Sequence, residues 1–543
     1  MDPAHPLRTW HLPASAGPQM PDAGLASPGA TSDGSTGLKA RVAGLDTEAG
    51  RTMSDAEKER LGDWFAINIL RRGVLPVTLD DLGIAIDALA SSSDPRPHEQ
   101  VFVIAEAGQI RWSRQTASLP RGIRYVVARG RVGEAGADVL VSTRPPSNST
   151  EAFLQVAAWD ATQGHFNFYE RIGASWFWEG NSGMALDVPT RGRGPFDSHV
   201  NGGLVMKELA RPWMHWESTS QTIALDAFPP DHPVVTDRYF ARRQPAHLLE
   251  VNIVRPGIER WSRARLDRVL DDATGIRAPA HLLRHVLMPT SVNVATSDSR
   301  SAASTSSLAL PYEFFLDREL LFDILDVPTD IAPVEVARAD YDAAVTSLGL
   351  HLRSGAFRQN GETFFAWPVP VRAFEDNVIV RELVQRGALS RHLVLALAMV
   401  DFTNPLTSAS RGGLMSCVPA GPVRVADLDL EISRAIAAAA RGAAAGTPLR
   451  SCADDLALSE AVLIERALAR IEAFWMEVKA KAAQPAGVLD LLRLADSRRR
   501  EFRRRPLIKE ISLTMPVSDE PPGAPFLRLT PAAGVEAIEP SIA

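Results

Sequence analysis

The spacing of apolar and polar positions changes along the chain and divides it into a strand-rich part and a helix-rich part. Between about residues 100 and 260, short β-branched or aromatic runs are often separated by Gly, Pro or Asn. These runs are QVFVIAEAG, RYVVARGRV, ADVLVSTRP, FLQVAAWD, HFNFYERI and SWFWEGN. Such spacing is typical of an antiparallel meander or a barrel-like sheet rather than of strand–helix–strand units.

Beyond residue 375, apolar residues recur with the spacing i, i+3, i+4 and charged residues occupy the opposite face, which indicates helices. The longest such segments are DNVIVRELVQRGALSRHLVLALAMVDF and ADDLALSEAVLIERALARIEAFWMEVKAKAA. An earlier helix is predicted over PYEFFLDRELLFDIL, and KEISLTMPV near the end is predicted to return to the sheet as a strand. The expected fold class is therefore α+β, with a β-rich central domain covered on one side by a mostly helical C-terminal domain.

Composition divides the chain further. The first 52 residues are rich in Pro, Gly, Ala, Ser and Asp and lack apolar periodicity, so we expect them to be disordered. Order is expected to begin with a helix after Ser54, because Ser54 and Glu57 have the spacing of a capping box, and Met53 before it is a candidate for the true first residue. The predicted parts are a disordered tail over 1–52, a β-rich domain with an N-terminal helix over 53–295, a polar loop over 296–310, and a mostly helical domain with a returning C-terminal strand over 311–543.

Bulk properties narrow the class of protein. The 543 residues are 45% hydrophobic and 23% charged, which is ordinary globular composition with room for a large core. The net charge of −7 gives no global basic field that would favour nucleic acid. Two cysteines, Cys417 and Cys452, are too few for a disulfide framework or a Cys-rich zinc site. The longest apolar run, residues 393–400, is far shorter than the roughly 20 residues that cross a bilayer. We therefore expect a soluble, cytoplasmic protein with no nucleic-acid or membrane partner; its oligomeric state is not indicated.

Aromatic, His and Glu residues concentrate between Gly164 and Glu217. Polar groups among so many apolar side chains need partners, because burying them unpaired is costly. We predict a functional pocket there. The predicted catalytic residues are His199, Glu208 and His215, followed by His165 and Glu217. The predicted substrate-binding residues are Trp176, Trp178, Trp213, Trp216, Tyr169 and Arg193.

Strand alternation and loop composition support some of these assignments. If HFNFYE is a strand, His165, Asn167 and Tyr169 share one face, which is either solvent-exposed or the wall of a polar pocket. Arg191 and Arg193 stand in a Gly-rich turn, where they either hold an anionic substrate or are simply solvated.

The predicted pocket favours an enzyme that acts on a small organic molecule. His199, Glu208 and His215 form the minimal ligand set for a divalent metal such as Fe(II), so a metal-dependent oxidoreductase is the leading expectation. The same groups without metal suffice for acid–base catalysis, and no other cofactor is indicated. The alternative is a non-catalytic ligand-binding or scaffold protein that uses the same aromatic cluster. Nucleotide-binding loops, zinc-protease motifs and a nucleophile elbow are absent from the sequence, so no family is assigned.

Three further features of the sequence lie outside this pocket or at its border. His281 and His285 share one helix face at the spacing of two ligands for one ion, but no carboxylate is near in sequence, which favours an exposed amphipathic helix. The six arginines between 498 and 505 favour a solvated helix end over a nucleic-acid site. Asp401 and Arg411 follow an apolar helix and could line the same pocket.

We predict that Trp213→Ala and Trp216→Ala each lower the free energy of unfolding by about 3–5 kcal/mol if the two indoles belong to the core. Urea denaturation of the purified variants measures this change. A near-neutral effect on stability, together with a loss of ligand binding, would instead assign the two residues to a pocket or a partner surface.

Overall fold

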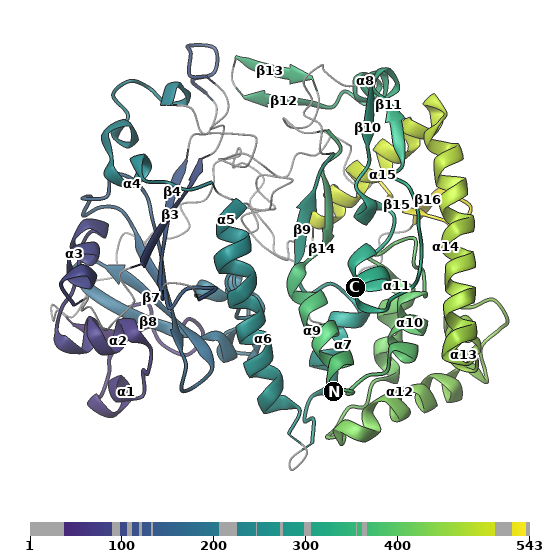
Figure 1. The fold of residues 1–543 in the computed structure, drawn as a ribbon, viewed down its shortest axis with the longest axis horizontal. Helices are drawn as coiled ribbons and strands as arrows, with labels where there is room; N and C mark the ends of the chain where they lie inside the picture. The colour runs from purple at the N-terminus through teal and green to yellow at the C-terminus, as the bar shows by residue number, and fades with distance from the viewer. Residues whose placement is uncertain are drawn as a thin grey trace.

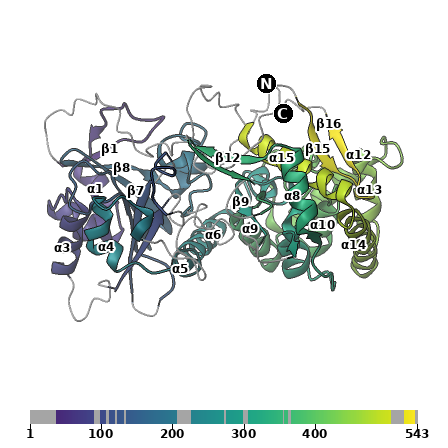
Figure 2. The same ribbon diagram turned by 90° about the horizontal axis from the view of Figure 1, so that it is seen from above.

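Figure 1 shows the chain as a strand-rich half formed by its earlier elements beside a helix-rich half formed by its later ones, and Figure 2 shows the same two halves from above. The expected α+β class is confirmed, because a mostly antiparallel sheet is joined by helices that concentrate toward the C-terminus. The computed structural model describes residues 37–89, 98–105, 111–118, 122–131, 134–205, 225–245, 247–271, 275–297, 306–354, 356–360, 366–504 and 524–538.

The strand-rich half is built on one eight-stranded sheet with the order β2-β1-β8-β7-β6-β5-β4-β3. Six of these strands form the expected antiparallel meander. They are β3 (His98–Ala105), β4 (Ile123–Gly130), β5 (Val139–Thr143), β6 (Leu154–Asp160), β7 (His165–Ile172) and β8 (Ser175–Asn181). Their β-branched and aromatic residues suit a sheet that is covered on both faces.

The expectation of a disordered tail over 1–52 is wrong for its last part. β1 (Leu38–Ala40) pairs parallel to β8, and β2 (Arg51–Thr52) pairs with β1. Ala40 is fully buried. Residues 1–36 lie outside the described part of the chain. The capping box that Ser54 and Glu57 predicted is present at the start of α1 (Asp55–Glu59).

Helices cover both faces of the sheet. On one face, Phe65 of α2 (Trp64–Asn68) packs edge-on against Tyr169 and Trp176. α3 (Leu79–Leu89) and α4 (Arg238–Ala241) lie on the same outer side in Figure 1. On the opposite face, α6 (Arg255–Val269) contacts β7, and Arg260 stacks over Phe166. α6 follows α5 (His247–Leu249) and stands between the sheet and the helix-rich half.

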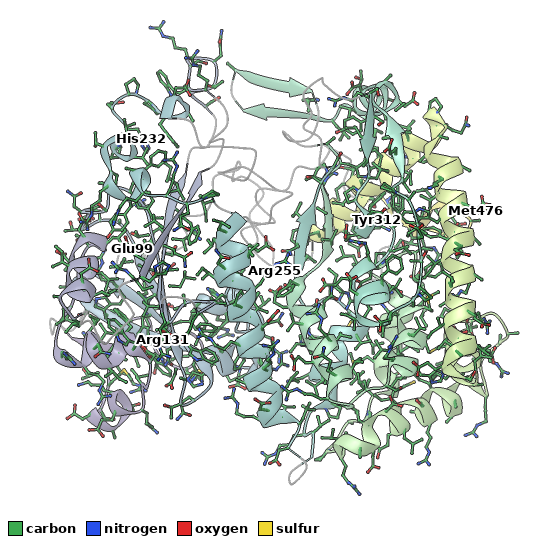
Figure 3. The ribbon with its side chains drawn as sticks, viewed as in Figure 1. Glu99, Arg131, His232, Arg255, Tyr312 and Met476 are labelled. Carbon is green, nitrogen blue, oxygen red and sulfur yellow. The ribbon has the colours of Figure 1, made fainter. Side chains whose placement is uncertain are left out.

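The helix-rich half packs around a second apolar cluster that runs from Leu266 to Ala533 in sequence. Its helices are α7 (Pro279–Leu287), α8 (Arg338–Ser347), α9 (Phe374–Gln385), α10 (Arg391–Ala398), α11 (Ala409–Gly413), α12 (Val425–Ala440), α13 (Pro448–Leu456), α14 (Glu460–Ala482) and α15 (Pro485–Arg504). α6 packs against α9 at the junction of the two halves, where Figure 3 labels Arg255. The Arg255 guanidinium stacks on the ring of Phe374.

Short strand pairs complete the helix-rich half. They are β9 (Val292–Ala295) with β14 (Val369–Arg372), β10 (Ser307–Ala309) with β11 (Glu335–Ala337), β12 (His351–Ser354) with β13 (Phe357–Asn360), and β15 (Phe526–Leu529) with β16 (Val535–Ile538). The predicted returning strand at 509–517 lies outside the described residues. The predicted helix after Pro311 is instead two short helical turns, η8 (Tyr312–Phe314) and η9 (Glu319–Ile324). The predicted domain boundaries stay predictions.

Within the described segments, no helix combines the length and the apolar character needed to span a membrane.

Strand β1 leads to Arg41, whose guanidinium contacts both Glu170 and Glu179. We predict that a chain starting at residue 53 is less stable than one starting at residue 37, because it loses this cation from a largely buried pair of carboxylates. Arg41→Met in the full chain should reproduce much of the loss, on the order of 3–5 kcal/mol. Urea denaturation measures both, with the exposed Arg71→Met as the control. Equal stability of the two truncated chains would show that β1 contributes nothing.

Candidate functional site

Several predicted substrate-binding residues belong to the core of the strand-rich half. Trp176 is fully buried, and its indole N–H donates to the Pro76 carbonyl at 3.0 Å. Trp178 donates to the side-chain oxygen of Asn167 at 3.0 Å. Because these polar hydrogens already have partners within the core, the two indoles serve packing in the described structure.

Asp63 is the centre of this buried polar network. It caps α2 by accepting from the Ala66 amide at 2.8 Å, and it accepts from Asn167 at 2.9 Å and from the Tyr169 hydroxyl at 2.5 Å. Burial raises the pKa of the Asp63 carboxyl to about 6, although the hydrogen bonds oppose this shift. The polar face of β7 that the sequence predicted is therefore closed by α2, and Tyr169 faces a carboxylate of its own chain.

The described histidines of the predicted site do not come together. The His199 ring packs on Phe168 at 4.7 Å, and its Nδ1 hydrogen-bonds to the Gly203 carbonyl at 2.8 Å. His165 begins β7, where alternation places it on the opposite face from Phe168. Burial lowers the pKa of both imidazoles, so both are neutral at pH 7. Arg193 is exposed, and its role in substrate binding stays a prediction.

The other predicted site residues lie outside the described part of the chain. They are Glu208, His215, Glu217, Trp213 and Trp216. The joint metal site with His199 therefore stays a prediction. Among the residues that the structure describes, no three His, Cys, Asp or Glu side chains are placed so that they could hold one metal ion.

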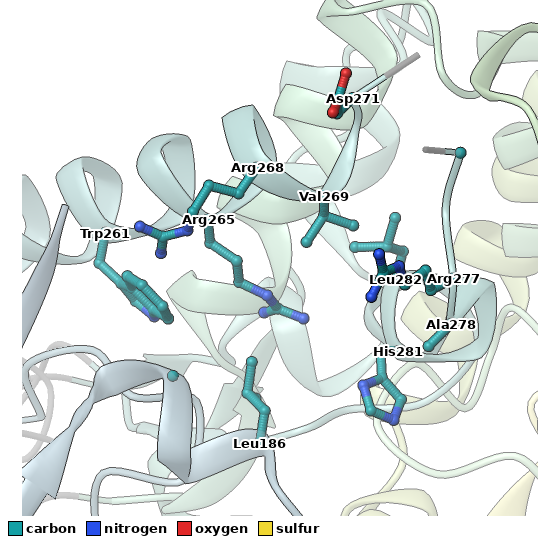
Figure 4. A pocket seen from close by; sticks show the side chains of 12 residues that line it. Leu186, Trp261, Arg265, Arg268, Val269, Asp271, Arg277, Ala278, His281 and Leu282 are labelled. Carbon is teal, nitrogen blue, oxygen red and sulfur yellow. The ribbon is translucent and has the colours of Figure 1, made fainter. Parts of the chain in front are cut away.

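The structure contains a different candidate site, a cavity of about 520 Å³ where α6, the start of α7 and η2 (Ser182–Leu186) meet. It lies between the strand-rich and helix-rich halves (Figure 4). The lining residues are Gly183, Leu186, Trp261, Arg265, Arg268, Val269, Asp271, Gly275, Arg277, Ala278, His281 and Leu282. We call this space the junction cavity.

The lining of the junction cavity is basic. Its described residues include three arginines and His281 but a single carboxylate, Asp271. Burial lowers the pKa of His281, and the positive charges of Arg191, Arg265 and Arg284 lower it further. Those charges show that the basic character extends beyond the lining residues themselves.

Arg265 is the unusual member of this set. Its side chain is nearly buried, with a relative exposure of 5%, and its only hydrogen bond in the described structure joins NH1 to His285 Nε2 at 3.4 Å. Burial lowers the pKa of the guanidinium to about 10, so Arg265 is still charged at pH 7. Figure 4 shows this guanidinium reaching from α6 into the space above Leu186.

The other buried arginines of the described structure are fully engaged. Each donates to at least two carboxylate, amide or carbonyl oxygens. They are Arg129, Arg171, Arg372, Arg411, Arg498 and Arg499. The expectation of a solvated end for α15 is therefore wrong for Arg498 and Arg499, because carbonyls from distant loops bind them. Arg411 likewise binds carbonyls rather than lining the predicted pocket.

A second buried network supports Arg265. His285 Nδ1 lies 2.8 Å from Asp376, a fully buried carboxylate in α9. Asp376 also accepts from the Thr290 amide at 3.0 Å and from the Thr290 hydroxyl. Because an ionised carboxylate only accepts, Nδ1 carries the proton and Nε2 is left to accept from Arg265. The expectation that His281 and His285 lie on an exposed helix is wrong for His285, which is buried.

The start of α7 adds to the positive character of the cavity. The helix begins with Pro279 at its first position after Ala278, which offers no side-chain cap. Ala278 and His281 both line the cavity. Pro279 has no N–H and the His281 amide donates to the Ala278 carbonyl, so it is the dipole of the helix N-terminus that favours an anion there.

Sequence reasoning found only one part of this site. The pairing of His281 with His285 at helical spacing was visible, but Asp376 is 91 residues beyond His285. Arg265 is one of many arginines in α6, and nothing in its local sequence distinguishes it.

Comparison with protein-family models, curated proteins and solved structures gives no match for this chain. The junction cavity therefore has to be interpreted from its own chemistry.

The Asp63 network yields a pH-dependent prediction. Because the pKa of the Asp63 carboxyl is raised in the folded protein, the free energy of unfolding falls as the pH rises from about 4 through 6. The Tyr169 hydroxyl opposes this loss because its hydrogen bond stabilises the charged carboxylate. Tyr169→Phe should therefore cost about 1–3 kcal/mol at pH 8 and less at pH 5. Urea denaturation at the two pH values measures this, with Asp63→Asn as the background in which the difference disappears. An equal cost at both pH values in the native background would contradict the prediction.

Proposed function

We propose that the protein binds a small organic anion in the junction cavity. The observation that carries this proposal is the nearly buried, charged Arg265, which faces the cavity and has no carboxylate or carbonyl partner in the described structure. The negative charge of Asp376 reaches Arg265 only across the His285 ring, so an anion bonded directly to the guanidinium would compensate the buried charge better and gain affinity from it.

The size and walls of the cavity suit an organic molecule. A volume of about 520 Å³ falls within the range of roughly 300–1,000 Å³ for small-molecule sites. Leu186, Trp261, Val269 and Leu282 supply apolar surface beside Arg265. The ligand is thus expected to carry an apolar body as well as its acidic group.

The remaining basic groups have a supporting role. Arg277 is exposed at the cavity, where it can attract an anion from solution. Arg268 already donates to the carbonyls of Gln163 and Gly164 and stacks over Trp261, so it mainly fixes the wall. The uncapped start of α7 adds a further site of positive potential.

Ligand binding, the alternative that the sequence predicted, is therefore a better-supported function than a metal-dependent oxidoreductase. Ligand binding needs only the groups that already line the junction cavity, whereas the oxidoreductase needs Glu208 and His215. An enzymatic role at the cavity would use His281, since imidazole is the side chain that exchanges protons most readily near neutral pH.

We predict that benzoate or phenyl phosphate raises the melting temperature of the protein, while the neutral isostere benzamide does not. An anion at ten times its dissociation constant should stabilise the protein by about 1.4 kcal/mol. Arg265→Gln should remove the anion effect, because it removes the buried charge. Differential scanning fluorimetry over a series of ligand concentrations measures the shift.

The control is Arg263→Gln on the same helix, since Arg263 pairs with Glu382 and does not line the cavity. It should keep the full anion response. Ala278→Phe, which fills the cavity without changing its charge, should lose it. An anion response that survives both Arg265→Gln and Ala278→Phe would place binding elsewhere and refute the proposal.

A further inference from the structure

We propose that Asp376 and His285 are positioning residues for Arg265, and that the acidic group they prepare it to bind is a carboxylate. This inference rests on the proposed function, because it names the class of ligand for the same cavity. It is carried by the chain of hydrogen bonds from Asp376 through His285 to Arg265 and by the chemistry of the cavity walls.

The first link of the chain is rigid. Asp376 is fully buried and accepts from the Thr290 amide, the Thr290 hydroxyl and His285 Nδ1. The Thr290 hydroxyl is itself held by the Asn201 side chain at 2.8 Å. The carboxylate therefore has a single orientation, fixed from three directions.

The second link fixes the imidazole. The proton on Nδ1 is held by Asp376, and Arg372 donates to the His285 carbonyl, so both the ring and the backbone of His285 are anchored. Nε2 then points its lone pair at Arg265 NH1, 3.4 Å away. A histidine that is bonded at one nitrogen presents the other in a defined tautomer and direction.

The third link leaves most N–H donors of Arg265 available for a ligand. A guanidinium has five N–H donors, and the bond to His285 uses one of them. The planar group is thereby oriented while the rest of its donor edge stays available to the cavity. A carboxylate matches such an edge with two parallel hydrogen bonds, which gives direction as well as affinity.

The walls favour a carboxylate over a phosphate. Among the described residues that line the cavity there is no Lys, Ser, Thr, Asn, Gln or Tyr, so these residues offer few side-chain donors for a third and fourth oxygen. Of the arginines that line it, Arg265 alone is buried, while Arg268 and Arg277 are exposed. One buried cation between apolar walls is best matched by a single negative charge on an apolar body.

The test compares three probes of similar size by isothermal titration calorimetry: benzoate, phenyl phosphate and benzamide. The wild-type protein should bind benzoate more tightly than phenyl phosphate, with benzamide the weakest. His285→Gln keeps an acceptor oxygen near the position of Nε2 and should retain benzoate affinity within about threefold. His285→Leu removes the acceptor at similar volume and should weaken benzoate binding at least tenfold while leaving benzamide unchanged.

Asp376→Asn provides a second variant in case His285→Leu does not fold. It keeps the shape of the side chain but no longer fixes the imidazole tautomer, so the preference for benzoate over phenyl phosphate should narrow. A merely structural role of Asp376 would lower the melting temperature without changing this preference.

The outcomes separate the two proposals. If neither anion binds the wild-type protein, both proposals fail. If benzoate binding depends on Arg265 but is equal in the wild type, His285→Leu and Asp376→Asn, anion binding stands and the positioning role is refuted. Tighter binding of phenyl phosphate than of benzoate would overturn the assignment of a carboxylate ligand.

Discussion

The geometry of the junction cavity depends on one buried carboxylate. Asp376 lies in α9, but its hydrogen-bond donors come from α7 and from the segment before β9. Through the Thr290 hydroxyl it is also linked to Asn201 of the strand-rich half, and the Asn201 carbonyl accepts from Trp261 of α6. Because an ionised carboxylate tolerates burial only when its oxygens are well supplied with donors, the elements that supply them are held in place together.

The hydrogen-bond partners of its buried arginine distinguish this junction from the rest of the described structure. In the helix-rich half, Arg411 donates hydrogen bonds to four backbone carbonyls and Arg498 donates to two more. Backbone carbonyl oxygens therefore stabilise both buried guanidinium groups. Arg265 is as buried as these two, yet it meets only a neutral imidazole. The negative charge of Asp376 acts on Arg265 only across His285, and we propose that an anionic ligand compensates the buried guanidinium directly.

Features set by local sequence were predictable. The cap at Ser54 depends on residues three apart, and the alternation in β7 correctly put Asn167 and Tyr169 on one face. Features set by distant partners were not predictable. β1 is stabilised by β8, more than 130 residues later, and its own three residues, Leu38–Ala40, gave no signal. The polar face of β7 is buried because Asp63 reaches it from 104 residues away in sequence.

The candidate site, too, depends on residues far apart in the sequence and was not predictable from local patterns. The concentration of Trp, His and Glu before residue 217 reflects a sheet core in its described part, where Trp176 and Tyr169 find partners within the fold. The junction cavity is instead lined from η2, α6 and α7, with Asp376 of α9 bonded to His285 behind it, and no short motif joins these elements. The most direct test of the account is a crystal structure with 4-bromobenzoate, whose bromine is located by anomalous scattering. The account predicts bromine among the apolar walls and the carboxylate on Arg265. Bromine elsewhere, or an Arg265 paired with a carboxylate of its own chain, would contradict it.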